Sequence, residues 1–252
     1  MRKMGIALQL YTLRDETGKD FEGTLRKVAE MGYEGVEFAG YGGMEAQRLK
    51  RLLDELNLKA CGSHVPLDRL RDHLDEELEF NRILGTRYMV CPGVFESDRG
   101  EKWKQHFALF SEIAPKIEAA GFRFGYHNHD FEFKESVDGQ PVFDALFAAV
   151  PAAQVELDVC WVTAAGYDPL AYIAKYAGRL PLLHLKDMRR DGDAVQTVIL
   201  GQGEVDLPAV IRAASDAGTE WLVVEQDNCQ IPPLDSVSQS LRWVREHYLS
   251  KL

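Results

Sequence analysis

Two histidines stand close together at the end of one apolar segment, in the stretch YHNHDFEF. His127 and His129 follow the apolar run 122–126, and residues 130–133 are expected to form a loop. Imidazole titrates near neutral pH and is the commonest metal ligand among side chains. The pair therefore predicts a proton-transfer site or part of a metal site; the alternative is an ordinary polar strand end.

Polar side chains end most of the other short apolar segments in the same way. Asp158 lies in VELDV, His184 in LLHL and Glu225 in LVVEQ. Such groups are costly to bury unless they are paired or bind a metal. Two carboxylates with two imidazoles suit Mn²⁺, Zn²⁺, Fe²⁺ or Co²⁺, whereas Mg²⁺ prefers oxygen ligands and is disfavoured. The alternative is a network of ion pairs without a metal.

Glu156 and Lys186 each lie two residues from one of these candidate ligands, and so on the same face of a strand. Either group could transfer a proton, as could His129. For Glu156, a fourth-ligand role, a carboxylate that orients a histidine and a buried ion-pair partner all stay open. For Lys186, the alternative is a salt bridge at the rim with Asp187 or Glu204.

Substrate contacts are expected from side chains that end the first three apolar segments or follow the sixth. The four candidates are Gln9, Glu37, His64 and Trp161. Aromatic side chains expected near the same place are Tyr11, Phe131, Phe133 and Trp161, which could stack on a sugar ring or pack loops. The sequence shows no obvious phosphate clamp.

Short strand-like segments alternate with helical ones along the whole chain. The strands are expected over residues 4–10, 35–38, 58–63, 88–91, 122–126, 154–159, 180–185 and 221–225. Helical spacing of apolar residues predicts helices over 21–31, 45–56, 70–84, 103–120, 142–150, 169–176, 207–217 and 236–249. Glycines at 32, 85, 121 and 218 are typical helix stops.

Eight strand–helix units in 252 residues predict one (β/α)8 TIM barrel domain over residues 1–252. An open doubly wound sheet is the alternative, but no glycine-rich phosphate loop follows the first strand. In a barrel, the C-terminal ends of all strands meet at one mouth, where catalytic groups lie. The polar strand ends are therefore expected to converge.

Composition narrows the classes of partner. The chain has 29 basic and 40 acidic residues, a net charge of −11, which disfavours nucleic acid and anionic membranes. No segment is apolar and long enough to predict a membrane span, and no signal peptide is predicted. Four separated cysteines show no disulfide framework. We therefore expect a cytoplasmic protein with free thiols.

Six segments in this order resemble the xylose-isomerase-like TIM barrels, also called sugar phosphate isomerases/epimerases: IALQLYTLRD, GYEGVEF, YHNHDFEF, VELDVCW, LLHLKDM and LGQGEVD. The resemblance implies one divalent metal held by Glu, Asp, His and Glu side chains from strands five to eight. Asp158, His184 and Glu225 match the last three. His127 stands where the first glutamate is expected, and would replace it as a ligand.

The resemblance implies a metal-dependent isomerase or epimerase that acts on a sugar or keto-sugar through an enediolate. Glu225 would be one member of a two-glutamate acid/base pair, but His127 replaces the other member. The base would then be His129, Glu156 or Lys186. The small-molecule partner would be a carbohydrate, and a homo-oligomer is left open because members are often dimers or tetramers.

Four other functions remain as alternatives. The first is a metal-dependent dehydratase or lyase acting on a keto-inositol or 3-keto-glycoside, which shares the enediolate step. An apurinic-endonuclease-like hydrolase would need more metal ligands and a basic face. A non-catalytic sugar-binding barrel would need no metal. A purely structural barrel leaves the polar strand ends unexplained.

Overall fold

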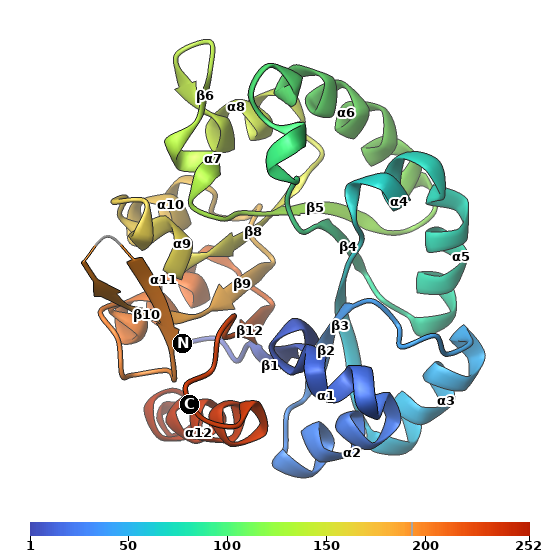
Figure 1. Cartoon of the computed structure of the whole chain (residues 1–252), viewed down its shortest axis with the longest axis vertical. Coiled ribbons are helices and arrows are strands. Elements are labelled where there is room, and N and C mark those ends of the chain that lie inside the picture. The colour runs from blue at the N-terminus through green and yellow to red at the C-terminus, as the bar shows by residue number, and fades with distance from the viewer. Residues whose placement is uncertain (193) are drawn as a thin grey trace.

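The computed structural model describes residues 1–192 and 194–252, and its centre is a closed barrel of parallel strands (Figure 1). The barrel confirms the predicted fold and has the strand order β1-β12-β9-β8-β5-β4-β3-β2. Its strands are β1 (Gly5–Gln9), β2 (Gly35–Ala39), β3 (Lys59–His64), β4 (Tyr88–Cys91), β5 (Arg123–His127), β8 (Gln154–Asp158), β9 (Leu182–Leu185) and β12 (Trp221–Val224).

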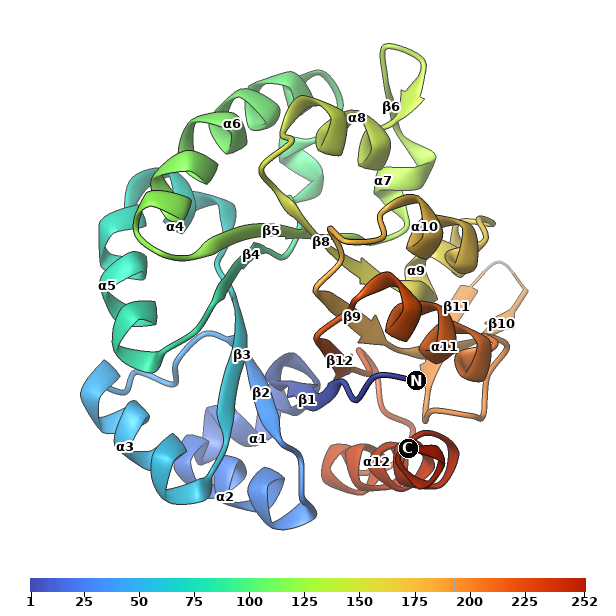
Figure 2. The ribbon, with the colours of Figure 1, turned by 180° about the vertical axis from the view of Figure 1, so that it is seen from behind.

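Helices form a ring around the barrel, seen from its two ends in Figures 1 and 2. They are α1 (Arg14–Lys19), α2 (Phe21–Met31), α3 (Ala46–Leu56), α4 (Leu67–Asp72), α5 (Leu74–Leu84), α6 (Trp103–Ala119), α7 (Phe131–Lys134), α8 (Val142–Ala149), α9 (Val159–Ala164), α10 (Pro169–Lys175), α11 (Leu207–Ala217) and α12 (Pro233–His247). Short 3-10 turns are η1 (Leu10–Leu13), η2 (Glu96–Asp98), η3 (Gly100–Lys102) and η4 (Leu249–Lys251).

Helix ends follow the glycine pattern of the sequence. Gly32, Gly85 and Gly218 end α2, α5 and α11 in the left-handed conformation, with φ of 93°, 77° and 89°. An L-residue with a side chain adopts this backbone conformation at a cost, which favours glycine. Each glycine turns the chain from the outer ring back into a barrel strand.

Two local expectations were wrong. Residues 130–133 are not a loop, because the Asp130 carbonyl accepts from the N–H groups of Phe133 and Lys134 and starts the short helix α7. The single helix expected over 70–84 is instead α4 and α5, separated at His73, where φ is −137°.

The loops after β5 and β9 carry two small hairpins that the sequence reasoning missed. They pair β6 (Ser136–Val137) with β7 (Gln140–Pro141), and β10 (Asp187–Asp191) with β11 (Ala194–Val198). No helix among the described residues has the length and apolarity needed to cross a bilayer. The four cysteines are free, as expected.

The barrel interior changes from apolar to polar along the strands. Its N-terminal end is filled by Ala7, Cys61, Val223, Tyr88, Val90 and Leu182. On β9, Leu182 belongs to this apolar layer, and His184 lies two residues nearer the C-terminal end. His184 pairs in register with Asp158 of β8 and with Val223 of β12. The period-two alternation of strands therefore carries the ionisable side chains above the apolar layer, toward the mouth.

Candidate metal centre and active site

Four side chains converge at the C-terminal ends of β5, β8, β9 and β12. One ligand atom from each of His127, Asp158, His184 and Glu225 lies within 4.8 Å of the others, and we call these residues the upper quartet. His184 Nδ1 is 2.9 Å from Glu225 Oε2, and Asp158 Oδ2 is 3.4 Å from His127 Nε2. Metal–ligand bonds of about 2.0–2.2 Å place two ligand atoms of one ion roughly 3–4 Å apart. The spacing therefore fits one small divalent ion.

The chemistry of the upper quartet also fits a metal. His127 Nε2 and Asp158 Oδ2 are buried and have no hydrogen-bond partner among the described residues. The other nitrogen of His127, Nδ1, lies 3.4 Å from the Pro92 carbonyl oxygen, which can accept its proton. This arrangement leaves Nε2 with a lone pair directed at the quartet, as a metal ligand requires.

A lysine lies among the carboxylates of the same site. Lys186 Nζ is 2.6 Å from Glu225 Oε2 and 2.9 Å from both Asp158 Oδ2 and Asp227 Oδ2. The angles of these contacts do not meet those of a hydrogen bond, so they are ion pairs. The lysine side chain is fully buried. Three carboxylates and one ammonium leave a formal charge of −2, which one divalent cation would neutralise.

A second group of four lies one layer deeper in the barrel and shares His184. We call Glu37, His64, Glu156 and His184 the lower quartet. His184 Nε2 lies 2.7 Å from Glu37 Oε2, while its Nδ1 faces the upper quartet. His64 Nε2 lies 2.6 Å from Glu156 Oε2. Gln9 Nε2 donates to Glu37 Oε2 at 2.8 Å, so a largely buried polar network supports the upper quartet from below.

Burial and neighbouring charge set the protonation of these groups. Burial, together with the neighbouring Glu156 carboxylate, raises the pKa of Glu37 to about 7. Burial opposes ionisation of Glu156 as well, but His184 and His64 hold its pKa well below the usual value. Burial also lowers the pKa of Lys186, yet the surrounding carboxylates raise it well above its usual value. At neutral pH, Glu156 is therefore a carboxylate and Lys186 an ammonium.

His129 faces the pocket from the loop that follows β5. Its backbone N–H donates to Glu132 Oε2 at 2.7 Å, and its ring stacks on Phe131 with centroids 5.3 Å apart. Its Nδ1 is buried and has no partner among the described residues. Burial lowers the pKa of His129 well below its usual value, and the neighbouring His127 and Lys186 act in the same direction. The ring is therefore neutral at pH 7 and can accept a proton.

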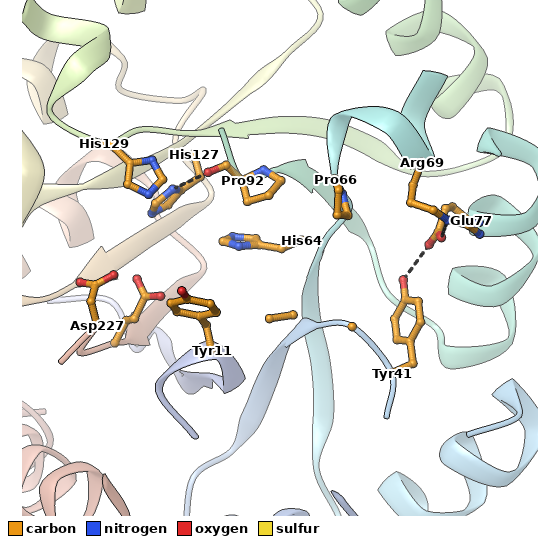
Figure 3. Close-up of a pocket in the computed structure, with 13 residues that line it drawn as sticks. Tyr11, Tyr41, His64, Pro66, Arg69, Glu77, Pro92, His127, His129 and Asp227 are labelled. Carbon is orange, nitrogen blue, oxygen red and sulfur yellow. Dashed lines mark hydrogen bonds and ion pairs between the residues drawn. The ribbon is translucent and has the colours of Figure 1, made fainter. Parts of the chain in front are cut away.

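A pocket of about 640 Å³ opens at the mouth above these groups (Figure 3). It is lined by Tyr11, Ala39, Gly40, Tyr41, His64, Pro66, Arg69, Glu77, Pro92, His127, His129, Glu225 and Asp227. The pocket is in the size range of sites that enclose small-molecule ligands. Its floor exposes two members of the upper quartet, His127 and Glu225.

The structure brings together all the residues predicted for the site, in distinct positions. His64 and His129 line the pocket, whereas Gln9 and Glu37 are fully buried beneath His184. Trp161 is half-buried, with its ring 5.3 Å from Lys186 Nζ.

The structure contradicts the alternative pairing of Lys186 and the expected position of Phe133. Lys186 does not pair with Asp187 or Glu204, because its ammonium turns into the barrel toward Asp158. The Asp187 carboxylate instead accepts from four backbone N–H groups and fastens the segment 201–205. Phe133 is not at the mouth, because its ring is buried against Phe143.

Sequence reasoning missed Asp227 and Asn128. Asp227 follows Glu225 by two residues, so the same alternation that selected Glu156 could have found it. Asn128 joins β5 to β8, because its amide donates to the Asp158 carbonyl and its oxygen accepts from the Asp158 N–H. It carried no signal beyond its place between two histidines.

The sequence was compared with models of known protein families. The model described as "Xylose isomerase-like TIM barrel" matches residues 25–247. The chain belongs to this family.

Relatives and solved structures of this family resemble the chain over nearly its whole length. The rhizopine catabolism protein MocC of Rhizobium meliloti is 28% identical and is matched over 87% of this chain and 79% of its own. An inosose dehydratase of Clostridium beijerinckii is 22% identical and is matched over 97% of this chain and 96% of its own.

Solved structures show the same fold. A sugar phosphate isomerase/epimerase from Parabacteroides distasonis superposes with a TM-score of 0.81, 24% identity and coverage of 96% and 98%. The IolI protein with a bound zinc atom superposes with a TM-score of 0.78, 14% identity and coverage of 99% of each chain. At these identities, the likeness shows the shared barrel fold alone.

Proposed function

We propose that this protein is a metal-dependent enzyme that removes the proton next to the carbonyl of a keto-sugar or keto-inositol, forming an enediolate. Reprotonation at a different position or face would give isomerisation or epimerisation. The observation that carries the proposal is the upper quartet beneath the pocket, next to a neutral histidine. Membership of the xylose isomerase-like family supports it.

The upper quartet would hold the metal. A divalent ion bound by His127, Asp158, His184 and Glu225 would act as a Lewis acid that polarises the carbonyl and stabilises the enediolate. Two imidazoles and two carboxylates favour Mn, Zn, Co or Fe over Mg. The zinc found with IolI, a protein of the same fold, is consistent with this choice.

We assign proton abstraction to His129. Its ring lines the pocket, and its lowered pKa keeps the imidazole neutral, the form that can accept a proton. Glu156 is less suited, because it is buried below the pocket and faces His64. Lys186 stays protonated beside its carboxylates, so its role is that of a fixed positive charge. Glu225 reaches the pocket and would hold or return a proton at the opposite side.

The small-molecule partner in this proposal is an uncharged carbohydrate. Gln9 and Glu37 lie outside the pocket, so their contribution is to orient His184 instead of contacting substrate. His64 lines the pocket and remains a candidate substrate contact, and Trp161 covers Lys186.

Dehydration is a second candidate, favoured by one observation. By the family resemblance, His127 stands where a first metal-binding glutamate is expected, so the upper quartet holds one glutamate, Glu225, instead of a pair. Loss of a hydroxyl β to the carbonyl needs one base and one proton donor, and no such symmetric pair. The similarity to inosose dehydratase supports this outcome.

The test follows proton exchange and product formation in one experiment. Metal-loaded protein is incubated in D₂O with a keto-inositol and, separately, with ketoses, and NMR records α-deuteration and products. Wild type should incorporate deuterium, and the product should distinguish an isomer or epimer from an unsaturated dehydration product. His129→Gln should slow exchange by about 10²–10⁴-fold, the usual contribution of a general base.

His73→Gln is the matched control, because His73 is exposed between α4 and α5, on the outer ring, where it pairs with Glu76. It should exchange at the wild-type rate. Equal exchange in wild type and His129→Gln would remove His129 as the base. No exchange with any of these ketones would refute the proposed function.

A further inference from the structure

The pocket extends well beyond the metal centre. Its far end, which we call the distal arm, is formed by Ala39, Gly40, Tyr41, Pro66, Arg69 and Glu77. Figure 3 shows Tyr41, Arg69 and Glu77 on one side and His127, His129 and Asp227 on the other, with His64 and Pro66 between them. The proposed reaction uses none of the distal-arm residues.

Hydrogen bonds hold the distal arm in place. Tyr41 Oη donates to Glu77 Oε2 at 3.0 Å and accepts from Asn81 Nδ2 at 3.0 Å. The ring of Tyr41 stacks on Phe80, with centroids 4.0 Å apart. Arg69 Nε donates to Glu77 Oε1 at 2.8 Å. Because these side chains are already ordered, the protein loses little conformational entropy when a ligand contacts them.

The charge of the distal arm disfavours an anionic ligand. Of the described residues that line the pocket, Arg69 is the only lysine or arginine. Its guanidinium already pairs with Glu77 at 2.8 Å and with Glu76 at 2.9 Å. Two carboxylates on one guanidinium leave a net negative charge, and Asp227 and Glu225 line the opposite end. A phosphate in the distal arm would meet repulsion from the pair of carboxylates on Arg69.

The walls of the distal arm suit a ring. Ala39, Gly40 and Pro66 offer apolar surface, and Tyr41 offers an aromatic ring. A pocket of about 640 Å³ is also of the size that encloses drug-sized ligands, larger than a single six-membered ring.

We propose that the distal arm is a second binding subsite, which takes an uncharged ring attached to the reacting polyol. This inference rests on the proposed function, because it places the reacting ring over the upper quartet. It narrows the substrate class to an unphosphorylated molecule with two rings, joined across His64 and Pro66. The second ring is aryl or glycosyl, since both are uncharged and present an apolar face that can pack on Tyr41.

Binding of non-reacting analogues tests the subsite. Isothermal titration of the metal-loaded protein compares methyl β-glucoside, phenyl β-glucoside, cellobiose and phenyl β-glucoside 6-phosphate. Phenyl β-glucoside or cellobiose should bind at least about tenfold tighter than methyl β-glucoside, the gain expected from burying roughly 60 Å² of apolar surface. The phosphorylated probe should bind more weakly than its unphosphorylated counterpart.

Ala39→Phe should reduce the affinity ratio of phenyl to methyl glucoside to near one, because the new ring fills the distal arm. Ala39 is exposed at the end of β2 and makes no side-chain hydrogen bond. Ala148→Phe, at an exposed position on α8, is the matched control and should keep the tenfold ratio.

A ratio near one in wild type, no binding of any probe, or tighter binding of the phosphorylated probe would overturn the inference. A ratio that Ala39→Phe leaves unchanged would place the second ring elsewhere and overturn it as well. Proton exchange with an unsubstituted keto-inositol reports on the proposed function separately. If proton exchange occurs but phenyl β-glucoside binds no tighter than methyl β-glucoside, the subsite alone is refuted. If phenyl β-glucoside binds tighter but no proton exchange occurs, the proposed function alone is refuted.

Discussion

Lys186 gives the sharpest prediction about stability. Its ammonium is fully buried and lies 2.6 Å from Glu225 and 2.9 Å from both Asp158 and Asp227. Lys186→Met keeps most of the side-chain volume but leaves three carboxylates without their cation. Removing one partner of a buried ionic group costs about 3–5 kcal/mol. We expect the free energy of unfolding of the metal-free protein to fall by that amount.

Chelator-treated protein, unfolded with urea and followed by circular dichroism, measures this loss. In a chain of this size, about 3–5 kcal/mol corresponds to a fall in melting temperature of roughly 6–20 °C. Lys175→Met is the control, because Lys175 pairs with Asp144 while 52% of its side chain is exposed. Exposed pairs contribute about 0–1 kcal/mol, so the control should stay close to wild type.

Added divalent metal should then stabilise Lys186→Met more than wild type. The ion restores positive charge to carboxylates that the variant leaves unbalanced, and binding to the folded state alone raises the melting temperature. Metal-free Lys186→Met within about 0.5 kcal/mol of wild type would refute this reasoning. A loss as large in Lys175→Met would show that the effect is not specific to the buried cluster.

Three other perturbations have defined outcomes. Glu37→Gln should weaken metal affinity about 10–100-fold in competition with a chromogenic chelator, because the Glu37 carboxylate orients His184; wild-type affinity would contradict this role. Glu132 has a pKa raised to about 8 by burial, so its contribution to stability is complete below the ordinary carboxyl pKa and is lost as pH rises through 8. Urea unfolding of metal-free protein should therefore show a larger loss of stability between pH 5 and 8 in wild type than in Glu132→Gln, and equal losses would refute it. Asp187→Ala should destabilise the protein by at least about 3 kcal/mol, because four backbone N–H groups lose a charged acceptor; a loss under about 1 kcal/mol would contradict this account.

The barrel and its polar end could be predicted because both depend on local patterns. Glycine stops and short apolar runs gave the order of elements, and strand alternation placed Asp158, His184 and Glu225 on one face. Convergence at the mouth then followed from the topology, since parallel strands end at the same side of a barrel. His127 is the last residue of β5, which puts its side chain beside Asp158.

Pairing between side chains could not be predicted, because it depends on directions that the sequence does not encode. Lys186 has acidic candidates on both sides of the barrel wall, and only its inward direction selects Asp158 over Asp187. Glu37 and Glu156 both lie in apolar strands. Glu37 nevertheless lies closest to His184, whereas Glu156 lies closest to His64. The distal arm unites residues from the end of β2, the loops after β2 and β3, and two helices, which no sequence spacing indicates.

The central claim is tested most directly by measuring bound metal with plasma mass spectrometry. Wild type, Asp158→Asn, Glu156→Gln and the control His73→Gln are purified, supplied with Mn, Zn, Co or Fe and dialysed. We predict about one ion per chain in wild type and control, and loss of the ion in Asp158→Asn, which removes an upper-quartet ligand. Glu156→Gln should retain the ion. Loss in Glu156→Gln but not in Asp158→Asn would place the metal in the lower quartet, and no metal in wild type would contradict the account.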